Sequence, residues 1–235
     1  MINKNLNGGF NTSAIVISRK KHKLYSVFTF ITPNLGIIRA SLPHKRLQTL
    51  RNSSFLRPFS GMYITVVPDG EYVKVTQIDG SYVVETLDSN LENIAYTAVA
   101  SELIQELFAL YDVDRSVFDV VANYSKQIRN RNVRLATIIL GWQLLAKSGV
   151  VPQGHVLSSL EESSPFWQEL FFATHRYPTK EMMSSLVHVL NYAWKSEEHL
   201  VITKSTWSEL EQSLLVFATR EVGKELQSVK FLLTL

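Results

Sequence analysis

The sequence predicts an α+β protein in which a small β-barrel is followed by an all-helical domain. Up to about residue 86, β-branched and aromatic residues come in short runs separated by turn residues, which is typical of strands. From about residue 87 the apolar residues recur at the helical period instead. We therefore expect a strand domain at 1–86 and a helical domain at 87–235.

Tight turns separate the expected strands. Pro33 and Asn34, followed by Gly36, mark one reversal, and Pro68-Asp69-Gly70 and Asp79-Gly80 are hairpin signals. Short strands joined in this way indicate a small closed or partly closed barrel, and an OB-fold is the leading expectation. The expected strands are 13–19, 24–32, 35–41, 62–67, 72–78 and 82–85.

The helical domain begins with an apolar stripe between Leu91 and Tyr111. Asp114 is expected to cap a second helix, and a third runs from about residue 130 to Lys147, before Ser148-Gly149. Further helices are expected to start at Ser164-Pro165, Pro178-Thr179 and Lys204-Ser205.

The location expected from the sequence is the cytoplasm, without a membrane contact. The first apolar run, 14–17, is too short for a signal peptide, and the longest, 135–146, falls short of the roughly 20 residues that span a bilayer. The chain has no cysteine, which excludes disulfides and thiolate metal sites and fits a reducing compartment.

Charge is distributed unevenly along the chain. The first 68 residues contain ten lysines and arginines and no carboxylate, although the whole chain carries only +3. Residues 69–119 carry −9, 120–160 carry +5 and 161–235 carry −3. Cations without interspersed carboxylates repel one another unless a polyanion neutralises them, so the first domain is expected to bind nucleic acid.

No catalytic constellation is evident, and we expect a protein that is not an enzyme and needs no cofactor or metal. The sequence lacks the phosphate loop, the G-x-S-x-G elbow and the H-E-x-x-H helix. Asp112, Asp114 and Asp119 could in principle hold Mg²⁺, but a helix cap with acids in the first turn explains them more simply. The six histidines show no ligand spacing.

The expected nucleic-acid site lies on the barrel, where OB-folds bind single strands with cations on phosphates and aromatics on bases. Six aromatics could stack on bases, and we expect one or two to face a ligand: Tyr25, Phe28, Phe30, Phe55, Phe59 and Tyr63. The expected cationic residues are Arg19, Lys20, Lys21, Lys23, Arg39, Lys45, Arg46, Arg51 and Arg57.

Five segments, taken in order, resemble the bacterial recombination mediator family RecO. They are 13–19 (SAIVISR), 25–40, 43–60 (PHKRLQTLRNSSFLRPFS), 134–152 (RLATIILGWQLLAKSGVVP) and 223–232 (GKELQSVKFL). The resemblance extends along nearly the whole chain. It departs from many members at 153–180, where their four-cysteine zinc module would follow and this chain has no cysteine. The resemblance therefore implies a member with a degenerate zinc-module region and no zinc.

The resemblance implies binding to single- and double-stranded DNA and annealing of complementary strands in recombinational repair. It implies two direct partners, RecR and the single-strand-binding protein SSB, which would be bound through its C-terminal tail. RecA is implied as an indirect partner, and the nucleoid as the location in the cell. Arg134 stands at the family's matching arginine, with Arg129, Arg131 and Trp142 near it. Because Arg131 and Arg134 are spaced i,i+3, they can share a helix face, so we expect the tail there. The alternative is that these arginines meet the acidic block at 69–119.

Two other functions stay open. The chain could be an RNA-binding or ribosome-associated barrel, which a preference for RNA over DNA would reveal. It could also be an adaptor that contacts acidic partners or anionic membrane, in which case DNA binding would not exceed the effect of bulk charge.

Overall fold

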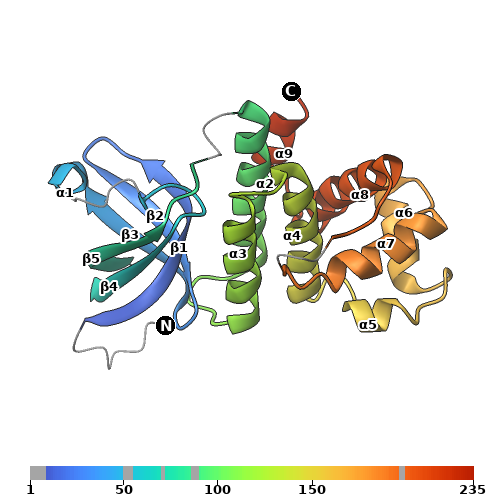
Figure 1. Cartoon of the computed structure of the whole chain (residues 1–235), viewed down its shortest axis with the longest axis horizontal. Helices are drawn as coiled ribbons and strands as arrows, with labels where there is room; N and C mark the ends of the chain where they lie inside the picture. Colours follow the sequence, from blue (N-terminus) through green and yellow to red (C-terminus); the bar gives the residue numbers. More distant parts are fainter. Residues whose placement is uncertain (1–8, 50–54, 70–71, 86–89, 196–198) are drawn as a thin grey trace. The chain divides into compact units, whose positions relative to one another are not determined.

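The structure is a computed structural model that describes residues 9–49, 55–69, 72–85, 90–195 and 199–235 (Figure 1). The chain divides into two compact units. The first, here the barrel unit, comprises Met1–Ser89 and Phe108–Arg129; the second, the helical unit, comprises Asn90–Leu107 and Asn130–Leu235. The segment 108–129 thus groups with the strands, although its sequence is helical in character.

A closed five-stranded barrel forms the first unit, in the order β1-β2-β3-β5-β4. All neighbouring strands are antiparallel except β3 and β5, which are parallel. The short helix α1 (His44–Thr49) follows β3. The strands are β1 (Phe10–Lys21), β2 (Tyr25–Thr32), β3 (Gly36–Pro43), β4 (Gly61–Asp69) and β5 (Tyr72–Tyr82). The predicted fold class, an OB-like barrel followed by helices, is confirmed.

Side-chain alternation builds the barrel core. On β2, Phe28 and Phe30 are fully buried, and on β3, Ile38 and Ala40 face them from the neighbouring strand. Residues between these positions point away from the core, because successive side chains of a strand alternate between its faces. Cations on β3 and β5 that fall between core residues therefore project from the outside of the barrel.

The predicted turn at Asp79-Gly80 is wrong, because β5 continues through both residues to Tyr82. Gly80 pairs with Met62, next to a register shift between β4 and β5. A Cβ on Gly80 would lie 2.2 Å from the ring of Phe55. Glycine is therefore needed here because the Phe55 ring packs against it, and not because the chain reverses. Glycine in a strand interior often marks such a close approach.

Helix α3 (Arg115–Gln127) lies against the barrel within the first unit (Figure 1). Asp114 caps it as predicted, accepting the backbone N–H groups of Ser116 at 2.7 Å and Val117 at 3.3 Å. The ring of Tyr124 meets Phe59 edge-on at 5.0 Å.

The helical unit is built around α4 (Val133–Lys147), whose side chains are buried along most of its length. The predicted helix starts near Ser164, Thr179 and Ser205 are confirmed. The other helices are α2 (Leu91–Leu107), α5 (Gly154–Leu157), α6 (Pro165–Thr174), α7 (Lys180–Leu190), α8 (Lys204–Val222) and α9 (Gln227–Leu232). Among the described residues, every helix is too short or too polar to cross a membrane.

Candidate nucleic-acid interface

The β1–β2 turn and α1 lie at the same end of the barrel. Tyr25, which begins β2, pairs with Pro43, the last residue of β3. The backbone N–H of His44 then donates to the carbonyl of Leu24 at 3.0 Å. Two segments of the acid-free region are thereby brought together. The exposed cations at this end are Lys20 and Lys21, which end β1, Lys23 in the turn, and Lys45 on α1.

Arg39 on β3 and Lys74 on β5 add to this surface from the barrel wall. Ala40 and Val73 form the parallel pair between β3 and β5. Both are core residues, so Arg39 and Lys74 lie next to them on the outer face and are exposed. We use the name basic face for seven residues of the barrel: Lys20, Lys21, Lys23, Tyr25, Arg39, Lys45 and Lys74.

Sequence reasoning missed Lys74. It lies in the acidic block, whereas the rest of the expected site lies in the first 68 residues. A signal was available, because Val73 and Val75 flank it in an alternating strand and predict that it points outward. Its position beside β3 depends on a parallel pairing between distant strands, which local pattern does not show.

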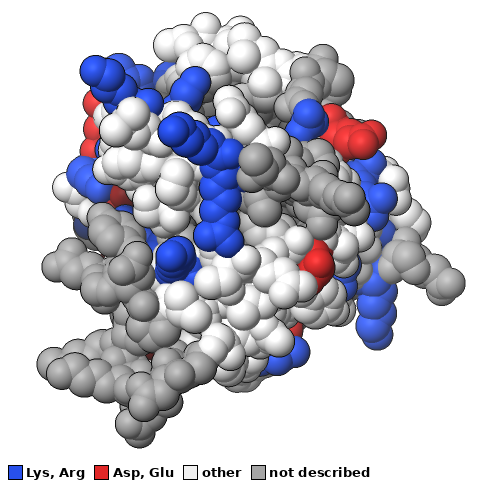
Figure 2. Space-filling view, turned by 90° about the vertical axis from the view of Figure 1, so that its left-hand side faces the viewer, with Lys and Arg blue, Asp and Glu red and all other residues white. Residues whose placement is uncertain are grey.

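Positive charge dominates the barrel surface in Figure 2, where lysines and arginines are spread among neutral side chains and few carboxylates are visible. The first three strands and α1 contribute no carboxylate, because the sequence has none before Asp69. The summed positive potential of such a surface attracts a polyanion.

Arg19 and Arg46 are held by the barrel itself. The Arg19 Nε donates to the Ser26 Oγ at 3.2 Å, and its guanidinium lies 5.3 Å from the centre of the Phe28 ring. The Arg46 guanidinium donates to the carbonyl of Thr76 at 2.7 Å, which ties α1 to β5. Both arginines therefore contribute positive charge and also hold parts of the barrel together.

Arg57 is exposed on the segment that precedes β4. The segment around it is held to β1, because Phe59 donates to the Val16 carbonyl at 2.7 Å and Val16 donates to the Ser60 carbonyl at 3.1 Å. It leads into β4, which flanks β1 on the side opposite to β2. The predicted Arg51 lies outside the described residues.

Two of the six candidate aromatics are exposed. Phe28, Phe30 and Phe59 are fully buried, and Phe55 packs against the core. Tyr63 is 60% exposed but lies on β4, between Ser13 and Asp79. Tyr25 is 39% exposed and is the one that lies beside the cations.

One of the four residues expected to bind the SSB tail lies inside the helical unit rather than on its surface. Trp142 is fully buried, and its indole N–H donates to the Leu210 carbonyl at 3.1 Å. Its expected place in a surface site is therefore wrong. Arg129 belongs to the barrel unit, with its guanidinium 5.8 Å from the centre of the Tyr82 ring.

Arg131 precedes Asn132, the N-cap of α4, so the expected helical i,i+3 relation with Arg134 does not apply. The Arg131 guanidinium donates to the hydroxyl of Tyr192 and, at 3.0 Å, to the carbonyl of Lys195. It anchors the segment after α7 to the start of α4.

Arg134 forms an ion pair with Glu211 on α8, outside the acidic block that the sequence suggested. Glu211 is 7% exposed and also accepts a hydrogen bond from the Tyr96 hydroxyl. The hydrogen bond to Glu211 raises the pKa of Arg134. Burial, followed by the bond to the same carboxylate, raises the pKa of Tyr96. This triad stabilises the helical unit.

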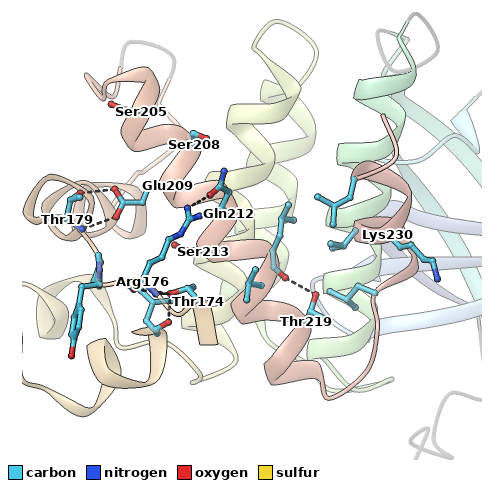
Figure 3. A pocket seen from close by; sticks show the side chains of 18 of the residues that line it. Thr174, Arg176, Thr179, Ser205, Ser208, Glu209, Gln212, Ser213, Thr219 and Lys230 are labelled. Atoms are coloured by element: carbon cyan, nitrogen blue, oxygen red, sulfur yellow. Dashed lines mark hydrogen bonds between the residues drawn. The ribbon is translucent and has the colours of Figure 1, made fainter. Parts of the chain in front are cut away.

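A groove of about 1190 Å³ opens between α8, α9 and the segment after α6 (Figure 3). Its charged groups bond mainly to neighbours. Glu209 accepts the Thr179 backbone N–H at 2.9 Å and hydroxyl at 2.8 Å. Arg176 donates to Gln212 at 3.3 Å, and Lys230 lies 3.3 Å from a carboxylate oxygen of Glu225. These contacts fix the charged side chains that line the groove.

The region expected to be a degenerate zinc module contains α5 and α6. In the described parts of the chain, no three His, Asp or Glu side chains gather as a metal site would require. Asp114 is occupied as a helix cap, and Asp119 pairs with Arg115 at 3.1 Å.

Fold and surface together define a class of architecture, an OB-like barrel with an exposed basic face joined to a helical unit. Neither the comparison with protein-family models nor that with curated proteins gave a match.

Proposed function

We propose that this protein is a DNA-binding recombination mediator without catalytic activity. It binds single- and double-stranded DNA through the basic face, anneals complementary strands, and helps replace SSB by RecA at gaps. The observation that carries the binding proposal is the set of exposed cations on an OB-like barrel whose first 68 residues contain no carboxylate.

The basic face is suited to the phosphate backbone. Five of its cations are lysines, whose flexible ammonium groups act as point charges and do not read base edges in a fixed geometry. Binding should therefore tolerate any sequence. If all six cations contact phosphates, a plot of the logarithm of single-strand affinity against the logarithm of salt concentration should have a slope of about −4. Each contact contributes about −0.7 to this slope.

The mediator role rests on the resemblance of five ordered segments to the RecO family. That resemblance supplies SSB, RecR and RecA as proposed partners, and the cytoplasmic nucleoid as the proposed location. Since Trp142 is buried, it would not take part in the proposed contact with the SSB tail.

The test is the annealing rate of two complementary oligonucleotides coated with cognate SSB. The proposal predicts that the wild-type protein accelerates annealing and that Lys20→Glu/Lys21→Glu/Lys23→Glu abolishes the acceleration. Lys126→Glu is the matched control, because Lys126 is exposed on α3 in the same unit and outside the basic face. No acceleration by the wild type, with tighter binding to RNA than to DNA of equal length, would favour the RNA-binding alternative.

A further inference from the structure

The β1–β2 turn carries two stacked aromatic rings. The imidazole of His22 and the phenol ring of Tyr25 have their centres 4.7 Å apart and their planes 16° from parallel. Tyr25 remains 39% exposed, and Leu24 between them is 74% exposed. A flat aromatic stack in a solvent-exposed turn offers a surface on which another planar group can stack.

Two backbone hydrogen bonds fix the turn that carries these rings. The N–H of His22 donates to the carbonyl of Tyr25 at 2.8 Å, and the N–H of His44 donates to the carbonyl of Leu24 at 3.0 Å. The backbone that carries the rings is therefore fixed before a ligand arrives. A preorganised site loses less conformational entropy on binding.

Phosphate-binding groups surround the stack. Lys21 and Lys23 flank His22 in sequence, and both are exposed. Lys45 follows His44, whose backbone is bonded to the turn. A ligand that satisfies both features is planar and carries negative charge beside its ring, which describes a nucleotide.

We propose that the Tyr25–His22 stack binds an unpaired base and makes the β1–β2 turn the determinant of preference for single strands over duplex. Bases within a duplex are stacked on one another and offer no free face to a side chain, whereas single strands can stack their bases on aromatic residues. This inference rests on the proposed nucleic-acid binding of the basic face and assigns its base contact.

The experiment compares Tyr25→Leu with Tyr63→Leu. Both changes replace an exposed tyrosine of the barrel, but Tyr63 lies on β4, outside the basic face. Affinity is measured for three probes: an oligothymidylate, the same strand with abasic sites throughout, and a duplex of equal length. Tyr25→Phe, which keeps the aromatic ring, serves as the conservative variant.

We expect Tyr25→Leu to weaken binding of the oligothymidylate about tenfold, the effect of losing one stacked base. Tyr25→Phe and Tyr63→Leu should each change it less than about twofold. The loss should disappear on the abasic strand and on duplex. Equal losses on all three probes, or no difference between Tyr25→Leu and Tyr63→Leu, would overturn the stacking proposal while leaving phosphate binding intact. Failure of the wild type to bind any of the probes would instead remove the proposed function itself.

Discussion

His44 donates its backbone N–H to the carbonyl of Leu24 at 3.0 Å, which joins the first residue of α1 to the turn between β1 and β2. These residues are 20 positions apart in the sequence. The bond brings Lys45 to the end of the barrel that carries Lys21 and Lys23. A surface divided between two segments of the chain thus becomes continuous in the fold.

Lys45 and Arg46 should have different roles although they are adjacent. Arg46→Met removes the bond to the Thr76 carbonyl and should lower the free energy of unfolding of the barrel unit by about 1 kcal/mol. Lys45→Met should leave stability unchanged and weaken DNA binding. Urea unfolding followed by circular dichroism, together with a binding titration, separates the two effects. Equal loss of stability in both variants would count against the assignment.

Lys74 should bind DNA even though it lies in the acidic part of the sequence. Lys74→Glu is expected to weaken single-strand binding about as much as Lys20→Glu, by roughly three- to tenfold, since each places a carboxylate on the basic face. Fluorescence anisotropy with a labelled oligonucleotide measures this. A loss no greater than that of Lys126→Glu would exclude Lys74 from the interface.

Local patterns predicted the elements better than their pairing. The side chain of Asp114 satisfies backbone groups within its own helix, so its sequence position is enough to identify it. Gly80 has the same turn chemistry as a true hairpin, but the ring of Phe55, 25 residues earlier, requires the glycine. Trp142 and Lys74 show the same limit for the site. Helix packing buries the first, and a parallel strand pair places the second.

Gly36 should tolerate no side chain. Its φ is +63°, and a Cβ would lie 2.0 Å from the carbonyl oxygen of Asp112. Gly36→Ala and Gly36→Asn should both lower the free energy of unfolding by about 2 kcal/mol, since the clash adds to the backbone strain. Gly223 has a φ of +73° with no atom within 4 Å of the Cβ position, so Gly223→Asn should be nearly neutral. Stability retained in Gly36→Asn would show that strain alone governs this turn.

Stability should fall at alkaline pH because of Tyr96. Its folded-state pKa is raised above the ordinary 10.0 by burial and by the bond to Glu211. The stabilising contribution is therefore complete below pH 10 and is lost as the pH rises toward the folded-state pKa. Tyr96→Phe removes it, so the difference in unfolding free energy between wild type and variant should shrink from pH 8 to pH 11. Urea denaturation at both pH values measures this difference, and a constant difference would contradict the assignment.

The salt dependence of single-strand affinity, measured for the wild type and for Lys20→Glu/Lys21→Glu/Lys23→Glu, tests whether the basic face binds the nucleic-acid backbone. We predict a slope near −4 for the wild type, reduced in magnitude by about 2 in the variant, with equal losses for strands of different sequence. An unchanged slope in the variant would contradict binding at the basic face, and a changed slope in Lys126→Glu would place the nucleic acid near α3 instead.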